Sequence, residues 1–147
     1  MNQDTKHPEL AKIDFLIGTW KTQGVVLGNN TVPEVHFEGT DTYEWVCGGS
    51  FILHTVDVLM GNERINTIEV VGFDRAYNNY SFRSFDSNGN FLKMHGSFND
   101  TGAFVVITEN MRSTLTVNQP GKMMSAFWEQ SKDGDIWEPW MSLTLAK

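Results

Sequence analysis

The sequence predicts an all-β protein: a closed, up-and-down antiparallel barrel of about ten strands with a short N-terminal helix at one end. Three observations predict this fold. From residue 19 onward, apolar and polar residues alternate in short runs, as in strands with one buried face. Turn-forming Gly, Asn, Asp and Pro residues separate the runs. No segment between the runs is long enough for a helical crossover, so parallel pairing is excluded.

One stretch near the N-terminus has helical spacing. Residues 8–17 begin with Pro8 and Glu9, which suit a first helical turn, and they place apolar residues roughly along one face. Gly18 is a typical helix stop. We therefore expect a helix over residues 8–17.

The rest of the chain is assigned to strands. A meander of this many strands can remove its exposed edges by closing on itself. A barrel of more than about eight strands leaves room for a ligand inside. No internal repeat or linker interrupts the pattern, so residues 1–147 are expected to form one domain. The predicted strands are residues 19–27, 35–47, 50–60, 64–74, 79–86, 91–98, 103–109, 112–117, 123–131 and 137–145.

Composition limits the classes of partner. The net charge is −7 and no Lys/Arg cluster is present, so neither a nucleic acid nor a membrane surface is an expected partner. The first eight residues are polar, and no apolar run approaches the roughly 18 residues of a membrane span. Cys47 is the single cysteine and cannot form an intrachain disulfide. Together these features predict a cytoplasmic protein.

Several motifs resemble known barrel families. Gly18-Thr19-Trp20 matches the Gly-x-Trp signature of lipocalins and related calycin barrels, in which the Trp packs across the closed end. More of the chain resembles a bacterial family, domain of unknown function 1579 (DUF1579). The resemblance implies a lipocalin-like barrel and leaves the function open, because the family has no settled activity. The matching pieces are residues 10–20, 43–45, 48–51, 60–61, 72–74 and 83–89.

No cofactor or metal is expected. Haem-binding nitrobindin-type barrels also begin with a Gly-x-Trp strand, and they hold iron through a histidine near the C-terminal end. Here the last histidine is His95, and this departure disfavours haem. The sequence contains no His-x-His, no His-Glu-x-x-His and no cysteine pair, which are the usual signatures of a metal site.

His54 is the first candidate site residue. It alternates in phase with Ile52 and Val56, so its imidazole is expected to point into the barrel. A buried imidazole can act as an acid, a base or a metal ligand. The other interpretation is a core histidine whose nitrogens are satisfied by neighbouring polar groups.

Glu69 and Arg83 form the second candidate. Glu69 is in phase with Ile65 and Val71, and Arg83 lies between apolar residues on the next strand, so both are expected inside and near each other. One interpretation is an ion pair that fixes the strand register, since isolated charges are costly to bury. The other is an arginine that receives a ligand carboxylate while Glu69 holds it in place.

Aromatic and Met side chains complete the candidate site, because they favour pockets for flat or flexible apolar molecules. Trp137 and Trp140 lie beside the last strand, where they would also suit a homodimer contact. The predicted ligand-binding residues are His54, Glu69, Arg83, Tyr43, Trp45, Trp128 and Met141.

Three functions are compatible with these features. The first is a protein that binds a small, mostly apolar or amphipathic molecule inside the barrel. The second is an enzyme, such as an isomerase or hydrolase, that uses His54 or Glu69 as a general base. The third is a structural or interaction protein that forms a homodimer through exposed aromatic residues.

Overall fold

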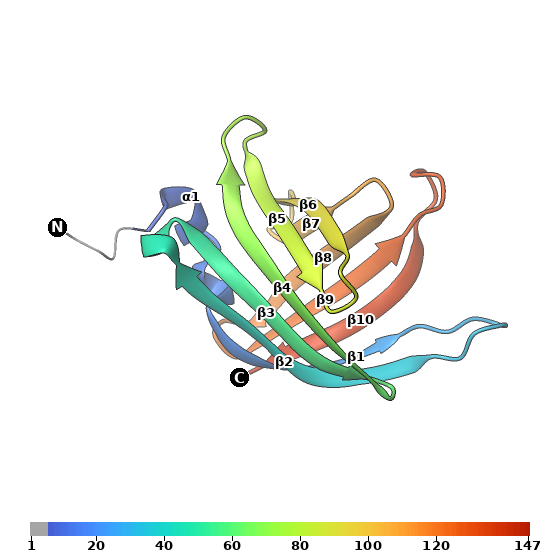
Figure 1. The fold of residues 1–147 in the computed structure, drawn as a ribbon. Helices are drawn as coiled ribbons and strands as arrows, with labels where there is room; N and C mark the ends of the chain where they lie inside the picture. The colour runs from blue at the N-terminus through green and yellow to red at the C-terminus, as the bar shows by residue number, and fades with distance from the viewer. Residues whose placement is uncertain (1–5) are drawn as a thin grey trace.

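Ten antiparallel strands close into a barrel in the computed structural model, which describes residues 6–147 (Figure 1). Each strand pairs with the next along the chain, and β1 pairs with β10 to close the sheet. The fold class predicted from the sequence is therefore confirmed. The strands are β1 (Gly18–Val26), β2 (Val35–Val46), β3 (Phe51–Met60), β4 (Glu63–Asp74), β5 (Asn79–Asp86), β6 (Phe91–Phe98), β7 (Phe104–Ile107), β8 (Met111–Gln119), β9 (Met123–Gln130) and β10 (Glu138–Ala146).

The strand ends lie close to the predicted ones because turn chemistry sets them. β5 and β6 have the predicted bounds. β7 ends earlier than expected, because the Thr108 hydroxyl accepts the backbone N–H groups of Asn110 and Met111 and turns the chain there. Near the start of β10, the pairing with β9 shifts register between Pro139 and Met141, where proline has no N–H to donate.

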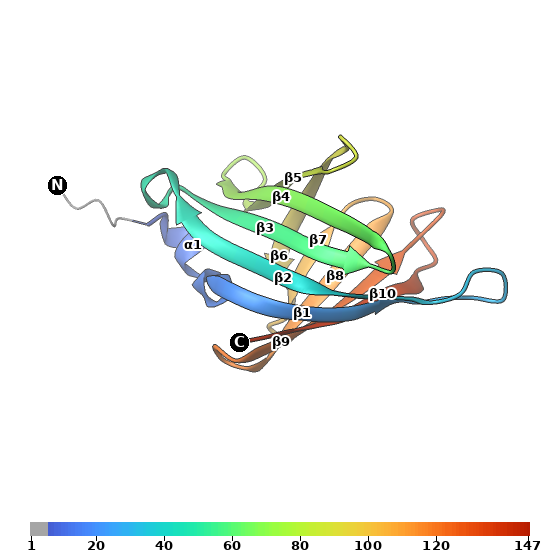
Figure 2. The same ribbon diagram turned by 60° about the horizontal axis from the view of Figure 1, so that its bottom comes forward.

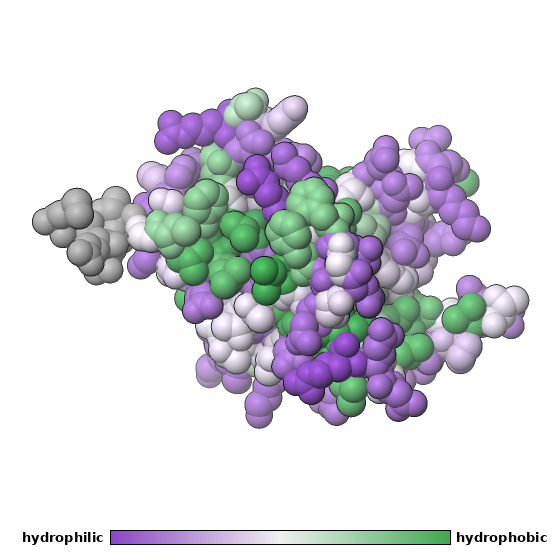
Figure 3. All heavy atoms as spheres, viewed as in Figure 1, coloured by the Kyte–Doolittle hydropathy of each residue, from purple (hydrophilic) through white to green (hydrophobic). Residues whose placement is uncertain are grey.

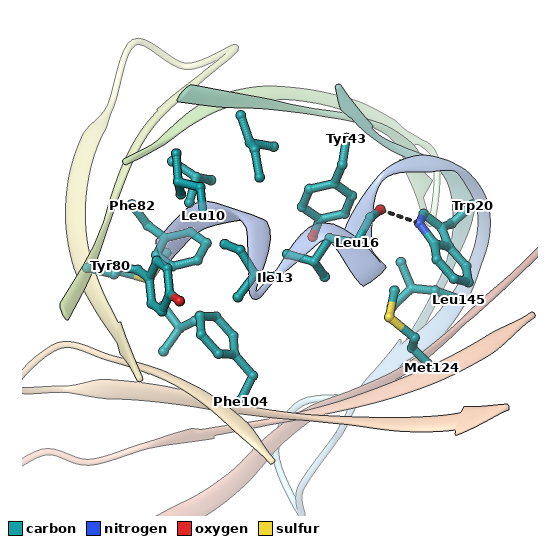
Figure 4. Packing of buried hydrophobic residues seen from close by; sticks show 14 residues of the cluster. Leu10, Ile13, Leu16, Trp20, Tyr43, Tyr80, Phe82, Phe104, Met124 and Leu145 are labelled. Atoms are coloured by element: carbon teal, nitrogen blue, oxygen red, sulfur yellow. Dashed lines mark hydrogen bonds between the residues drawn. The ribbon is translucent and has the colours of Figure 1, made fainter. Parts of the chain in front are cut away.

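The N-terminal segment closes one end of the barrel. It contains a short helix, α1 (Pro8–Ala11), and a 3-10 turn, Asp14–Leu16. The helix expected over residues 8–17 is thus divided, and Ile13 leaves helical geometry with φ −110° and ψ 21°. The break lets Leu10, Ile13 and Leu16 all point into the barrel, where each is at most 2% exposed (Figure 4).

Trp20 connects this N-terminal segment, residues 8–16, which we call the plug, to the first strand. Its indole Nε1–H donates to the carbonyl oxygen of Leu16 at 2.7 Å, a bond drawn in Figure 4. From the C-terminal end of the chain, the Lys147 ammonium lies 4.4 Å from the centre of the Trp20 ring and donates to the Ile17 carbonyl. The Gly-x-Trp tryptophan therefore packs at the closed end of the barrel, as the lipocalin resemblance implied.

Apolar side chains also lie on the outside of the barrel. Figure 3 shows them (green) among polar side chains (purple). On β4, β5 and β6, the exposed side chains of Ile68, Phe85 and Phe91 form a row, because each lies opposite the next in the strand pairing. Apolar identity alone therefore does not distinguish the inner face from the outer face in this part of the sheet.

The end of the barrel opposite α1 carries the longer connections. The chain between β1 and β2 extends beyond the barrel there, as the two views in Figures 1 and 2 agree. Of the helical segments in residues 6–147, none has the length and apolar character needed to cross a membrane.

Candidate functional site

A cavity of about 310 Å³ occupies the barrel interior beyond the plug. All ten strands contribute to its wall, and Leu16 of the plug forms part of its floor. At the opposite end the lining residues Met60, Ile65 and Met141 are partly exposed, so the cavity reaches the surface there. A second groove, lined by residues of β1, β2, β3 and β10, contains none of the predicted site residues.

A charged cluster lies on one wall of this cavity. Tyr43 on β2 lies opposite His54 on β3, which in turn lies opposite Glu69 on β4. Asp41 is the inward residue that precedes Tyr43 on β2. His54 Nδ1 is 2.9 Å from Glu69 Oε1, and His54 Nε2 is 2.6 Å from Asp41 Oδ2. The imidazole is thus held between two carboxylates, and all three residues are buried.

His54 is protonated in this arrangement. Both ring nitrogens face carboxylate oxygens, and only the doubly protonated imidazolium can donate from both. Burial lowers the pKa of His54, but the hydrogen bonds and negative charges of Asp41 and Glu69 outweigh it and raise the pKa from 6.5 to about 9. The His54 side chain therefore carries a positive charge at neutral pH.

Neighbouring side chains hold the cluster in place. The Thr22 hydroxyl donates to Asp41 Oδ1, so both oxygens of this carboxylate are occupied. The Tyr43 ring stacks on the imidazole with centroids 3.9 Å apart and planes 10° from parallel. Burial, followed by the charges of Asp41 and Glu69, raises the pKa of Tyr43 well above 10, so the phenol stays protonated. A cation over an aromatic face is an attractive arrangement.

Several polar atoms at the cavity have no partner within the protein. Across residues 6–147, no hydrogen bond is made by Glu69 Oε2, by the Tyr43 hydroxyl or by the Ser113 hydroxyl, although all three side chains belong to buried residues. These atoms are not completely shielded from solvent, so a bound molecule or water in the cavity can reach them and satisfy them. Glu69 and Tyr43 make the wall formed by β2–β4 polar, and Ser113 lies across the barrel from them on β8.

Five of the predicted site residues line the cavity. Tyr43, His54 and Glu69 belong to the charged cluster. Trp128 and Met141 lie on the adjacent strands β9 and β10, where they are paired with each other. The expected inward direction of these side chains is confirmed, while their role in binding stays a prediction.

The predicted position of Arg83 is wrong. Its side chain is exposed on the outer face of β5, where it pairs with Val70 and Lys93, and Ser84 takes the place opposite Glu69. The inward residues of β5 have even numbers, and the apolar Phe85, which suggested the opposite phase, also points outward. The expected Glu69–Arg83 ion pair therefore does not form.

Trp45 also lies outside the cavity. It is half-buried beside the plug and packs against the apolar core, with the Lys6 ammonium 5.5 Å from the centre of its ring. Its inward phase on β2 is as expected, but it lies at the closed end of the strand, beyond Tyr43. Trp45 is therefore not among the residues that line the cavity.

The sequence interpretation missed Asp41, Thr22 and Ser113. Asp41 has the same phase on β2 as Phe37 and Tyr43, so alternation alone places its carboxylate inside the barrel. Thr22 has the phase of Trp20 in the same way. Ser113 carries no comparable signal, because a serine suits either face of a strand.

Trp137 and Trp140 are half-buried near the end of the barrel opposite the plug. The Arg112 guanidinium lies 4.4 Å from the centre of the Trp137 ring, and Trp140 packs edge-on against Trp128 at 6.0 Å. Both rings are thus engaged within the chain. The homodimer that they suggested stays a prediction.

The cluster is not arranged to hold a metal ion. Among the described residues, no group of three or more His, Cys, Asp or Glu side chains has a suitable geometry. The physical reason at this site is that His54 uses both ring nitrogens to donate to carboxylates, so no lone pair remains for a metal.

Comparison with solved structures shows the same type of fold. The crystal structure of Rv2717c from M. tuberculosis aligns with a TM-score of 0.73 over 97% of this chain and 99% of that chain, at 12% identity. A de novo designed fluorescence-activating β-barrel aligns with a TM-score of 0.50 over 91% of this chain and 94% of that chain, at 13% identity. At such identities the likeness concerns the fold alone.

Sequence comparison identifies the family. No curated protein matches the chain. The family described as "Protein of unknown function (DUF1579)" matches residues 3–136, which is most of the sequence. The match extends well beyond the motifs that first suggested it. The chain is therefore a member of the DUF1579 family, with a lipocalin-like β-barrel fold.

Proposed function

We propose that this protein binds a small, mostly apolar molecule inside the barrel and orients it through the polar wall at His54. The observation that carries the proposal is the cavity of about 310 Å³, whose walls are apolar except for the cluster and a few hydroxyl groups. Small-molecule sites are typically cavities of roughly 300–1,000 Å³ with apolar walls and a few placed polar groups.

The two parts of the cavity would contribute differently to binding. Val56, Met94 and Leu115 are among the side chains that would remove the apolar part of a ligand from water, which drives association. The free atoms of Glu69 and Tyr43 would then fix the direction of its polar end. His54 acts here as a positioning residue, because it touches both carboxylates and fixes the orientation of Glu69.

The geometry gives less support to the alternative of an isomerase or hydrolase. A general base needs a lone pair that can accept a proton. His54 has none free, because both nitrogens carry protons that are donated to Asp41 and Glu69. Of the two bases suggested by the sequence, only Glu69 keeps an atom, Oε2, that has no hydrogen-bond partner within residues 6–147. Binding without chemistry is therefore the function that we propose first.

A cavity-filling variant tests the proposal. Ala126 is buried and lines the cavity, so Ala126→Phe places a ring in the space that a ligand would occupy. The matched control is Ser97→Phe, which adds the same ring to the exposed outer face of β6. Binding of the neutral fluorescent probe N-phenyl-1-naphthylamine is measured for both variants and for the unaltered protein.

We expect the probe to bind the unaltered protein and Ser97→Phe alike, and Ala126→Phe at least about tenfold more weakly. Circular dichroism shows whether each variant keeps its sheet content. The proposal is wrong if a folded Ala126→Phe binds as tightly as the unaltered protein, or if the unaltered protein binds no small apolar probe.

A further inference from the structure

The charged groups around the cavity do not balance. The charged side chains in the described part of its lining are Asp41, His54 and Glu69. Two carboxylates and one imidazolium carry a net charge of −1. No Lys or Arg among residues 6–147 contributes to the lining, and Arg83, which would have supplied a second positive charge, points to solvent.

The hydrogen bonds within residues 6–147 leave one carboxylate oxygen of this negatively charged cluster free. The two Asp41 oxygens are bonded to Thr22 and His54, and Glu69 Oε1 is bonded to His54. Glu69 Oε2 is the carboxylate oxygen that remains without a partner in residues 6–147. In the largely apolar surroundings of the cavity, a cationic donor placed against this atom would form a charge-assisted hydrogen bond, which is stronger than a bond between neutral groups.

The surroundings of Glu69 Oε2 suit a cation with an apolar tail. The Tyr43 hydroxyl has a free lone pair and lies on the same wall, where a second hydrogen bond can form. From Glu69, the inward face of β4 continues through Thr67 to Ile65 at the open end. A chain attached to the cation would therefore run along apolar lining toward the surface.

We propose that the ligand of this barrel is an amphiphile with a protonated amine, whose ammonium group binds Glu69 Oε2 and whose apolar chain points to the open end. This inference rests on the proposed function, because it specifies the class of molecule that the same cavity binds. It excludes fatty acids as preferred ligands, since their carboxylate would meet Glu69 and Asp41 with like charge.

Three probes with eight carbons each and different head groups test the inference. Octylamine, octan-1-ol and octanoate are titrated into the unaltered protein at pH 7 by isothermal calorimetry. We expect octylamine to bind at least about tenfold more tightly than octan-1-ol, and octanoate to bind most weakly, because hydrogen bonds to charged groups are the stronger ones. This ordering needs no variant, so it does not depend on a variant's folding.

A charge-neutral substitution tests the role of Glu69. Glu69→Gln keeps the shape of the side chain and its acceptor for His54, but it removes the net charge of the cluster. We expect octylamine to lose at least about tenfold in affinity and octan-1-ol to change much less. Glu44→Gln is the matched control, because Glu44 points outward from the same wall on β2 and is exposed. It should leave all three affinities unchanged.

The possible failures are distinguishable. If none of the three probes binds, the proposed function itself is contradicted. If octan-1-ol or octanoate binds as tightly as octylamine, or if Glu69→Gln keeps the preference for octylamine, the barrel binds apolar molecules but the amine inference is wrong.

Discussion

The charge on His54 should make the stability of this protein depend on pH. The folded protein raises the His54 pKa from 6.5 to about 9, and one pKa unit corresponds to about 1.36 kcal/mol, so the imidazolium contributes about 3 kcal/mol to the free energy of unfolding. The side chain is only 11% exposed, so solvent screens the interaction little. Because the pKa is higher in the folded state, this contribution is complete below pH 6.5, declines between pH 6.5 and 9, and is lost above pH 9.

Urea unfolding at pH 6 and pH 9.5 measures this contribution. The comparison uses the unaltered protein, His54→Gln, and the control His36→Gln, in which the lost histidine is exposed on β2 and paired with Glu34. Between the two pH values, we expect the unaltered protein and His36→Gln to lose about 3 kcal/mol more than His54→Gln. Equal losses in all three proteins would refute the assignment of a buried imidazolium between two carboxylates.

Three further substitutions test the fold and the corrected site. Trp20→Phe should lower the free energy of unfolding, measured by urea titration, by about 1–3 kcal/mol, because the buried Leu16 carbonyl loses its hydrogen-bond donor. An unchanged value would contradict the packing of the plug on Trp20. Gly39→Ala should destabilise the protein by more than about 2 kcal/mol in thermal unfolding, since the added Cβ would overlap the Asp57 carbonyl oxygen. An unchanged stability would contradict the close packing of β2 and β3. Arg83→Ala should change the free energy of unfolding by less than about 0.5 kcal/mol and leave probe binding unchanged, because Arg83 is exposed on the outer face. A loss of probe binding would show that Arg83 does contribute to the site.

The barrel could be predicted from the sequence because its signal is repeated along the chain. Alternation and turn residues recur in every strand, so an error at one strand end does not change the topology. The division of the N-terminal helix could not be read from local spacing. It arises because Leu10, Ile13 and Leu16 must all enter the barrel, and because the Leu16 carbonyl is bonded to the distant indole of Trp20.

The candidate site could be predicted only where the phase of a strand was unambiguous. His54 and Glu69 are flanked by apolar residues of their own phase, and the structure places both inside. On β5 the phase was misread because Phe85 is apolar and yet exposed on the outer face, next to Phe91. The wrong phase placed Arg83 inside and gave the interior a second positive charge, beside His54, that the structure does not place there. The phase of Asp41 predicts that its side chain lies inside the barrel, but only the strand pairing shows that it meets His54.

A crystal structure of the protein grown with octylamine tests amine binding in the barrel most directly. We expect an alkyl chain inside the barrel, with its nitrogen roughly 2.7–2.9 Å from Glu69 Oε2 and its tail directed past Ile65. An interior filled by side chains, or an amine bound only on the outer surface, would contradict it.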